Sequence, residues 1–514
     1  MNKTINKICV LGVVLLTLSA ASCRKESDNL YTYDHNDAMV FEAAKKSFAE
    51  QFKILWNGLS QNYGIWDVEM GYGLDWDAVY DKYLPQFEAL DKKEDVYDDE
   101  LKALLDEVVA PLHDGHLRVD MYNYRTNQYV KSSPSKLRNA SRSDYNVVTE
   151  NVNTKTYYYD IIEWYNAELS ARAALDDLYE SGVPWLEAQI KDISSKTTPT
   201  EMELFRLQHM KDLLVGINSI ADLSTAPQQI AFCNNLATKY AFLNVPGLRT
   251  YTPVYYGDSY TNIQYVLFGD NIAYLRFNQF SLSEFFDPEI EKEVHPNPTE
   301  GDVVLINSVK EVWHQWFNKI QELKQAGTLG GVIIDLRNNC GGYLDDYQYV
   351  LGALLPSGGF EYGKSRYKQG TGRLDYSAMM PQIGATYAGT HEVVTEPIVV
   401  LTNCNSISMA EMTAQGAKQL DNARVIGKRT WGGLCGLNDN SNFSQQYSGY
   451  VGVVGVTPVY AYVPSSNGFT MEGKSLEGIG IEPDIDVDFD QNLYSTSGRD
   501  SQLDRALEYI RTGK

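Results

Sequence analysis

The sequence predicts a mixed α/β (α+β) protein with a helical amino-terminal domain, an inserted and mainly helical middle region, and an α/β core. Three observations support this prediction. From Ile272 onward, short apolar runs alternate with segments of helical periodicity, as in strands joined by helices. Before residue 120, apolar positions recur at helical spacing. The composition, 43% hydrophobic and 22% charged residues, is that of a globular protein. A chain of 514 residues is too long for one compact core, so we expect two or three folded domains.

The first 23 residues are predicted to be an export signal. Lys3 and Lys7 form a short basic region, and the apolar run Ile8–Leu18 is too short for a membrane span. Small residues then lead to Cys23. This pattern resembles the bacterial lipoprotein signal, in which the cysteine is acylated and becomes the mature amino terminus.

The lipoprotein resemblance implies an address and a membrane contact. Cys23 would be the lipid anchor, residues 24–36 a tether, and the protein an outer-membrane or periplasm-facing lipoprotein of the cell envelope. Ala20 stands three residues before the cysteine, where the pattern usually has leucine. Plain secretion with cleavage nearby is therefore the alternative.

Residues 37–120 are predicted to form the amino-terminal helical domain. Apolar residues recur at helical spacing in two segments, at Phe41, Ala44, Phe48, Phe52, Leu55 and Leu59, and again at Leu101, Leu104, Leu105, Val108 and Leu112. Residues 121–265 form the middle region, with a polar stretch followed by helical patterns at Ile161–Leu178 and Met202–Ala221. The residues of this region indicate no function.

Residues 266–490 are predicted to form the α/β core, and residues 491–514 a helical tail. The expected strands are Ile272–Phe277, Val332–Leu336, Ile398–Leu401 and Arg424–Ile426. The expected helices are Val309–Leu323, Tyr347–Leu355 and one that begins near Ser408.

Charge and cysteine spacing exclude several classes of function. A formal net charge of −23 excludes nucleic acid as the main partner. The spacing of the later cysteines, Cys233, Cys340, Cys404 and Cys435, matches no zinc ribbon or redox pair. They could be four free thiols or form one or two disulfides. We expect neither a metal ion nor a cofactor.

The segment Ile398–Glu411 carries the first chemical signal. A strand leads into a tight turn, and a helix starts at once, so Ser408 stands at a helix amino terminus. Free backbone N–H groups there can stabilise a developing oxyanion. The alternative is a purely structural capping box, in which Ser408 is the N-cap and Glu411 stands three residues later.

A second segment, Asp335–Gly342, also follows a predicted strand and ends in paired glycines. Glycine allows the backbone to approach a ligand closely. Together, the D-x-R-x-N-x-G-G and S-x-S-x-x-E segments resemble the C-terminal-processing (tail-specific) serine peptidases over roughly Ile272–Val487. The resemblance implies a crotonase/ClpP-like core fold, a peptide or protein substrate, Ser408 as the nucleophile, and an oxyanion hole formed by Met409 with Gly341 or Gly342.

The same resemblance suggests the general base. The lysine that one branch of the family carries after T-x-G is absent, because Gly433 follows Thr430-Trp431-Gly432. The tricorn-like branch uses a histidine in a D-G-H signature, which matches Asp114-Gly115-His116. We therefore expect His116 to be the base, with its neighbour His113 as the competing assignment.

An acid that orients the histidine would complete the site. Glu477 precedes a G-x-G-I-x-P-D motif similar to the terminal motif of the family. Gly115 occupies the place of the serine that often relays between histidine and acid, so water or direct contact would replace this serine. The expected function is a serine endopeptidase that acts through an acyl-enzyme. The alternative is a non-catalytic peptide- or ligand-binding lipoprotein on the same core.

Overall fold

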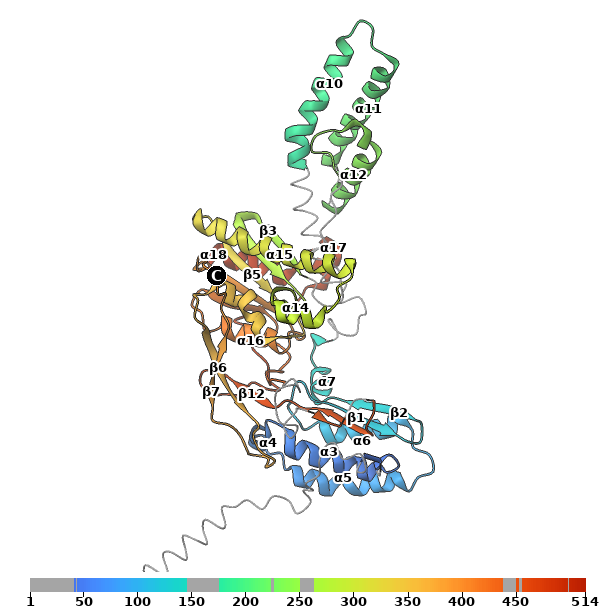
Figure 1. Ribbon diagram of the computed structural model, residues 1–514, viewed down its shortest axis with the longest axis vertical. Helices are drawn as coiled ribbons and strands as arrows, with labels where there is room; N and C mark the ends of the chain where they lie inside the picture. The colour runs from blue at the N-terminus through green and yellow to red at the C-terminus, as the bar shows by residue number, and fades with distance from the viewer. Residues whose placement is uncertain are drawn as a thin grey trace, which may run out of the picture. The chain divides into compact units, whose positions relative to one another are not determined.

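The computed structural model describes residues 41–42, 44–145, 175–222, 226–249, 263–437, 450–452, 455–497 and 499–514. They belong to two compact units. Unit one comprises the residues up to 138 together with 364–380 and 435–469, and unit two comprises 139–363, 381–434 and 470–514. Helices and sheets both occur, which confirms the predicted mixed α/β class (Figure 1).

A six-stranded sheet forms the centre of unit two, in the order β13-β9-β8-β5-β4-β3. Its strands are β3 (Gln264–Phe268), β4 (Ile272–Arg276), β5 (Gly331–Asp335), β8 (Ile398–Thr402), β9 (Ala423–Gly427) and β13 (Ile485–Asp486). All neighbouring strands pair in parallel except β3 with β4. Every residue of β4, β5 and β8 is buried, as expected of parallel strands with both faces covered.

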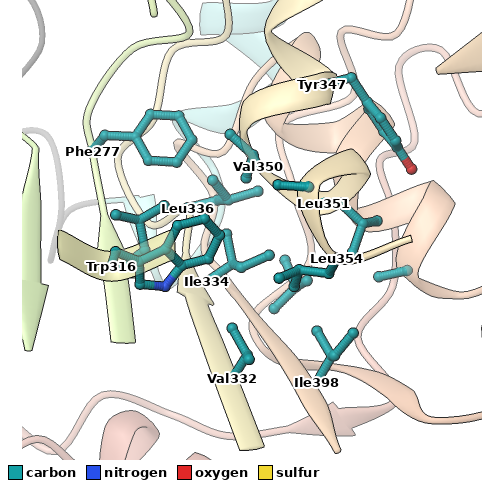
Figure 2. Close-up of a cluster of buried hydrophobic side chains, with 14 of the residues drawn as sticks. Phe277, Trp316, Val332, Ile334, Leu336, Tyr347, Val350, Leu351, Leu354 and Ile398 are labelled. Carbon is teal, nitrogen blue, oxygen red and sulfur yellow. The ribbon is translucent and has the colours of Figure 1, made fainter. Parts of the chain in front are cut away.

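Helices cover both faces of this sheet. On one face, residues such as Ile334 pack with α15 (Glu300–Gln325) and α16 (Met409–Ala417). Figure 2 shows Trp316 of α15 beside Ile334 and Leu336. On the other face, α18 (Ser501–Thr512) packs on Ile333, Val399, Leu401 and Ile426. Alternate residues of one strand therefore face different helix layers, which explains the uninterrupted apolar runs.

One predicted helix of the core is interrupted and is present as two short 3-10 helices. Residues Tyr347–Leu355 form parts of two 3-10 segments, η5 (Leu344–Tyr349) and η6 (Leu351–Leu354). Val350, at the junction, has φ −118° and ψ −101°, which no helix contains. A Cβ atom at Gly352 would lie 2.2 Å from the Ala385 carbonyl oxygen. Glycine, which has no Cβ atom, allows this close approach to the neighbouring backbone.

Unit one combines helices with an antiparallel sheet that the sequence did not indicate. Its helices are α3 (Phe48–Asn62), α4 (Trp66–Gly71), α5 (Trp76–Asp91) and α6 (Asp98–Val109). The sheet, in the order β10-β11-β1-β2, contains β1 (Arg118–Asn123), β2 (Gln128–Ser132), β10 (Tyr450–Val451) and β11 (Val459–Tyr462). The pairing of Arg118 with Tyr462 joins residues far apart in the chain, and periodicity cannot indicate such a pairing.

The middle region contains a helical group with its own apolar core. Its elements are the π-helical segment η1 (Leu178–Gly182), α10 (Val183–Ser195), α11 (Glu201–Asn218), η2 (Ser219–Asp222), α12 (Ala226–Lys239) and η3 (Ala241–Leu243). Leu186, Leu213, Ile217 and Leu236 are buried among these elements.

The remaining elements are α7 (Pro134–Asn139), η4 (Gly269–Asn271), α13 (Ser283–Phe286), α14 (Pro288–Val294), β6 (Phe360–Tyr367), β7 (Met380–Gly384), β12 (Ser466–Phe469) and α17 (Gln491–Ser497).

Some predictions concern residues that the structure does not describe. The export signal, the anchor at Cys23, the tether and most of Ile161–Leu178 lie outside the described residues. Within the described ranges, no helix combines the length and the apolar character that a bilayer crossing requires. The domain boundaries at 120, 265 and 490 stay predictions.

A buried ionic network fixes the end of β5. The Arg337 guanidinium, 1% exposed, donates to Asp335, to Asp500 (2.6 Å) and to Gln502 (3.1 Å). The Tyr274 hydroxyl also donates to Asp335, at 2.8 Å. Burial opposes ionisation of Asp335, but Arg337 and the other partners outweigh it and hold the pKa of this carboxyl below its ordinary value. The network thus ties the start of the D-x-R-x-N segment to the first turn of α18.

Arg337→Met is expected to lower the free energy of unfolding by about 3–5 kcal/mol, because two buried carboxylates, Asp335 and Asp500, lose the guanidinium to which they are hydrogen-bonded. Urea denaturation followed by circular dichroism measures this loss. Arg511→Met is the matched control, since the ion pair of Arg511 with Asp270 is about half exposed, and such pairs contribute about 0–1 kcal/mol. Equal, small losses in both variants would contradict a stabilising role of the network.

Candidate active site

Ser408 lies at the turn from β8 into α16. Its backbone has φ 57° and ψ −116°, a region that residues with a side chain rarely adopt. Strain of this kind costs on the order of 1–3 kcal/mol and persists only where the surrounding structure imposes it, often at active sites. The side chain is half-buried at the start of the helix. The local backbone therefore holds a hydroxyl at a helix amino terminus.

The loop before Ser408 is bonded to the segment that follows β5. The Ile407 N–H donates to the Asn339 carbonyl at 3.0 Å, and the Ser406 hydroxyl donates to the Leu336 carbonyl at 2.8 Å. The Asn338 N–H donates to the side chain of Asn403 at 3.0 Å. The two motifs, separated by about seventy residues in the chain, thus form one hydrogen-bonded site.

Gly341 lies directly against Ser408. A Cβ atom at Gly341 would lie 2.6 Å from the Ser408 Cβ and 2.9 Å from the Met409 nitrogen, and the φ of Gly341 is +83°. At Gly342, with φ +145°, a Cβ atom would lie 1.9 Å from the Phe280 carbonyl oxygen. Both positions therefore require glycine, on grounds of backbone conformation and of space.

Residues 271–487 match the family model described as Peptidase family S41. The chain carries an S41 peptidase domain. The chain is 28% identical over 180 residues to the Tricorn protease of Thermoplasma volcanium, a match that covers 35% of this chain and 14% of that protein. It is 28% identical over 232 residues to the Carboxy-terminal-processing protease of Bartonella bacilliformis, a match that covers 44% of this chain and 41% of that protein. The chain thus spans less than half of the length of these relatives.

Among solved structures, mature CPAF complexed with lactacystin is similar to the chain, with a TM-score of 0.42 and 14% identity. That match covers 92% of this chain and 98% of the CPAF chain.

The backbone donors beside Ser408 in the S41 domain differ in their availability. The Gly341 N–H donates to the Asn339 side-chain oxygen at 2.9 Å. Within the described residues, the N–H groups of Gly342 and Met409 have no hydrogen-bond partner. Of the predicted oxyanion-hole residues, Gly342 and Met409 therefore offer free donors, whereas Gly341 provides the close approach. Asn339 was not among the predicted site residues, and only its contact with Gly341 identifies its role.

Gly341→Ala is expected to lower kcat about 10²–10³-fold. The new methyl group would displace Ser408 and the Met409 N–H from the glycine turn, and the loss of one oxyanion-hole donor typically has an effect of this size. Steady-state hydrolysis of a peptide substrate measures the loss. Gly327→Ala is the control, since Gly327 also has a positive φ, +67°, but has open space around it. A similar loss of activity in both variants would show that backbone strain alone explains the effect.

Glu411 connects the start of α16 to the turn of residues 429–433. Its carboxylate is buried and accepts hydrogen bonds from the Ser408 N–H at 3.1 Å, the Thr430 hydroxyl at 2.6 Å, and the N–H groups of Gly432 and Gly433 at 2.7 and 2.6 Å. Burial raises the pKa of Glu411, and these donors counteract the rise. In the described residues, the Glu411 carboxylate therefore holds three backbone N–H groups and the Thr430 hydroxyl in place.

Glu477 is buried in the same unit as Ser408. Its carboxylate accepts a hydrogen bond from the Leu434 N–H at 2.6 Å, directly after the 429–433 turn. The residues that follow Glu477 bond back to this turn, from the Gly478 N–H to the Gly432 carbonyl and from the Ile481 N–H to the Thr430 hydroxyl. The terminal motif is therefore hydrogen-bonded to the same turn that donates hydrogen bonds to the Glu411 carboxylate.

His116 lies in unit one, and Ser408 in unit two. The His116 N–H donates to the Asp114 carboxylate at 2.6 Å. Its side chain is half-buried, and its Nδ1 atom is buried with no hydrogen-bond partner in the described part of the chain. Burial lowers the pKa of His116 to about 4, so that the imidazole is neutral at pH 7. The pairing of His116 with Ser408 stays a prediction.

The neighbours of His116 are held by buried carboxyl groups. Burial raises the pKa of Asp114 to about 7, although this carboxyl accepts two backbone N–H groups. The Nδ1 atom of His113, the competing base, lies 2.7 Å from the buried Glu69 carboxylate. This carboxylate also accepts the backbone N–H of His113. The Nδ1 atom of His113 is thus engaged in a hydrogen bond with Glu69 within unit one.

The described cysteines Cys233, Cys340, Cys404 and Cys435 are free thiols. Cys340 is exposed beside Gly341, and Cys404 is buried in the loop before Ser408. Burial, with a smaller effect of Asp144, raises the pKa of the Cys404 thiol to about 12. This thiol is therefore not ionised at neutral pH, unlike a reactive cysteine.

Proposed function

We propose that this protein is a serine endopeptidase that hydrolyses peptide bonds through an acyl-enzyme on Ser408, with His116 as the general base. The observation that carries the proposal is the strained Ser408 at the start of α16, in contact with the glycine turn. The S41 domain and the two named proteases among its relatives support the same chemistry.

In the proposed reaction, the Ser408 hydroxyl oxygen attacks the carbonyl carbon of the peptide while His116 accepts its proton. The N–H groups of Gly342 and Met409 stabilise the oxyanion, and Glu477 orients the imidazolium. The C–N bond then breaks, and the proton passes from His116 to the leaving amine. A water molecule next attacks the ester carbonyl and gives one proton to His116. The bond to Ser408 then breaks, the carboxylic acid product leaves, and His116 returns the proton to the Ser408 oxygen.

We further propose that the protein is exported and anchored in the cell envelope through an acylated Cys23. The basic and apolar segments before this cysteine support the assignment. Its substrates would then be envelope peptides or proteins. Metabolic labelling with an alkynyl fatty acid tests the anchor, because Cys23→Ser removes the acylation site and is expected to abolish incorporation.

A fluorophosphonate probe tests the proposed nucleophile. The probe is expected to label the full-length protein on Ser408, located by peptide mass spectrometry, and Ser408→Ala is expected to remove the label. Ser357→Ala is the control, because Ser357 is exposed and, among the described residues, its hydroxyl bonds to the Tyr387 carbonyl alone. Absence of labelling in the wild-type protein would favour a non-catalytic binding protein.

A further inference from the structure

Residues 139–145, which follow unit one in the chain, bind the backbone of the 429–433 turn within unit two. The Arg142 guanidinium donates to the Thr430 carbonyl at 2.7 Å and also to the Arg429 carbonyl. The Asn139 side chain donates to the Trp431 carbonyl at 3.2 Å. Three consecutive carbonyl groups of the turn are therefore bound by two side chains.

Arg142 is held in this position by its own surroundings. Its side chain is 10% exposed and forms a two-point ion pair with Asp144, with N···O distances of 2.9 and 2.7 Å. The Asp144 carbonyl in turn accepts the Cys404 thiol at 3.6 Å. A buried guanidinium whose nitrogens are bonded to fixed acceptors favours a single arrangement of the groups around it.

The other side of the same turn is bonded to Glu411. The turn provides three donors to the Glu411 carboxylate, and this carboxylate also accepts the Ser408 N–H. Arg142 is thus linked to the backbone of Ser408 by hydrogen bonds to the turn, by the backbone of the turn itself, and by the hydrogen bonds of Glu411. If the turn shifted, its donors would leave the carboxylate, and the strained backbone of Ser408 would lose a support.

We propose that Arg142 is a positioning residue for Ser408, and that residues 139–145 couple the middle region of the chain to the reaction through the 429–433 turn. The inference rests on the proposed function for its effect on catalysis. Arg142 touches no reacting atom. Its removal is expected to change kcat rather than KM, because its hydrogen bonds lead through the turn and Glu411 to the backbone of the nucleophile.

The test compares Arg142→Met and Arg142→Lys in the full-length protein with Arg424→Met as control. Arg424 also donates to two backbone carbonyls of unit two, those of Asp421 and Ala423, but not to the turn. Arg142→Met is expected to lower kcat on the order of 10²-fold, the effect of a small misplacement of a reacting group. KM should change less than threefold (about 0.7 kcal/mol). Arg142→Lys keeps the positive charge but replaces the several fixed N–H donors of the guanidinium by one ammonium group, so its kcat should lie between those of the wild type and Arg142→Met.

Amide hydrogen exchange provides a readout that does not depend on catalysis. In Arg142→Met, the N–H groups of Gly432, Gly433 and Ser408 are expected to exchange faster, while exchange in β5 and α18 stays unchanged. Unchanged exchange at these three amides, or a loss in KM alone, would overturn the positioning role. If Arg142→Met fails to fold, Arg142→Lys carries the same comparison. Failure of the wild-type protein to label on Ser408 would instead contradict the proposed function, and the exchange data would still decide the positioning role.

Discussion

Ser408→Ala is expected to lower kcat for peptide hydrolysis by about 10⁶-fold, the loss seen when the nucleophile of a serine protease is removed. No other described hydroxyl in this loop is placed to replace it, because the Ser406 hydroxyl is buried and bonded to the Leu336 carbonyl. Steady-state kinetics on a peptide substrate measures the loss, and circular dichroism checks that the variant is folded.

The residual activity of Ser408→Ala is informative as well. The free N–H groups of Gly342 and Met409 remain in the variant, so a rate about 10³–10⁴-fold above that in water is compatible with the proposed oxyanion hole. Ser357→Ala should retain wild-type kinetics. A Ser408→Ala variant that keeps more than a tenth of the wild-type kcat would contradict the assignment of the nucleophile.

His116→Ala is expected to lower kcat by a similar factor, about 10⁶-fold, because a serine hydroxyl is a weak nucleophile without a base. The pH profile of the wild-type protein gives an independent check. A general base acts in its neutral form, and burial lowers the pKa of His116 to about 4. A lowered pKa keeps the base neutral at lower pH, so kcat/KM should stay constant from pH 7 to about 5 and fall as the pH passes through about 4.

His113 provides the matched comparison for this prediction. Its ring is bonded to Glu69, so His113→Ala is expected to reduce kcat far less than His116→Ala. A larger loss in His113→Ala would transfer the role of base to His113. A break of the wild-type profile near the ordinary histidine pKa of about 6.5 would also contradict His116 as the base.

The sequence by itself determined the central layer of the fold. The apolar runs at β4, β5, β8 and β9 were predicted within about two residues, and so was the start of α16. β4, β5 and β8 are buried on both faces, so their composition alone indicates a strand. The two motifs were also legible, because each places special residue types at a strand end: paired glycines in one, and a serine before a helix in the other.

Tertiary structure alone decided which of these residues meet. Periodicity reports burial along one segment, whereas the sheet of unit one pairs β1 with β11 across more than 300 residues. The Asn339–Gly341 bond decides which glycine N–H is free, and it depends on a loop conformation with positive φ that no local pattern encodes. Arg142 and Thr430 carry no sequence signal either, since they act through backbone carbonyls and a carboxylate that only the folded chain brings within hydrogen-bond distance.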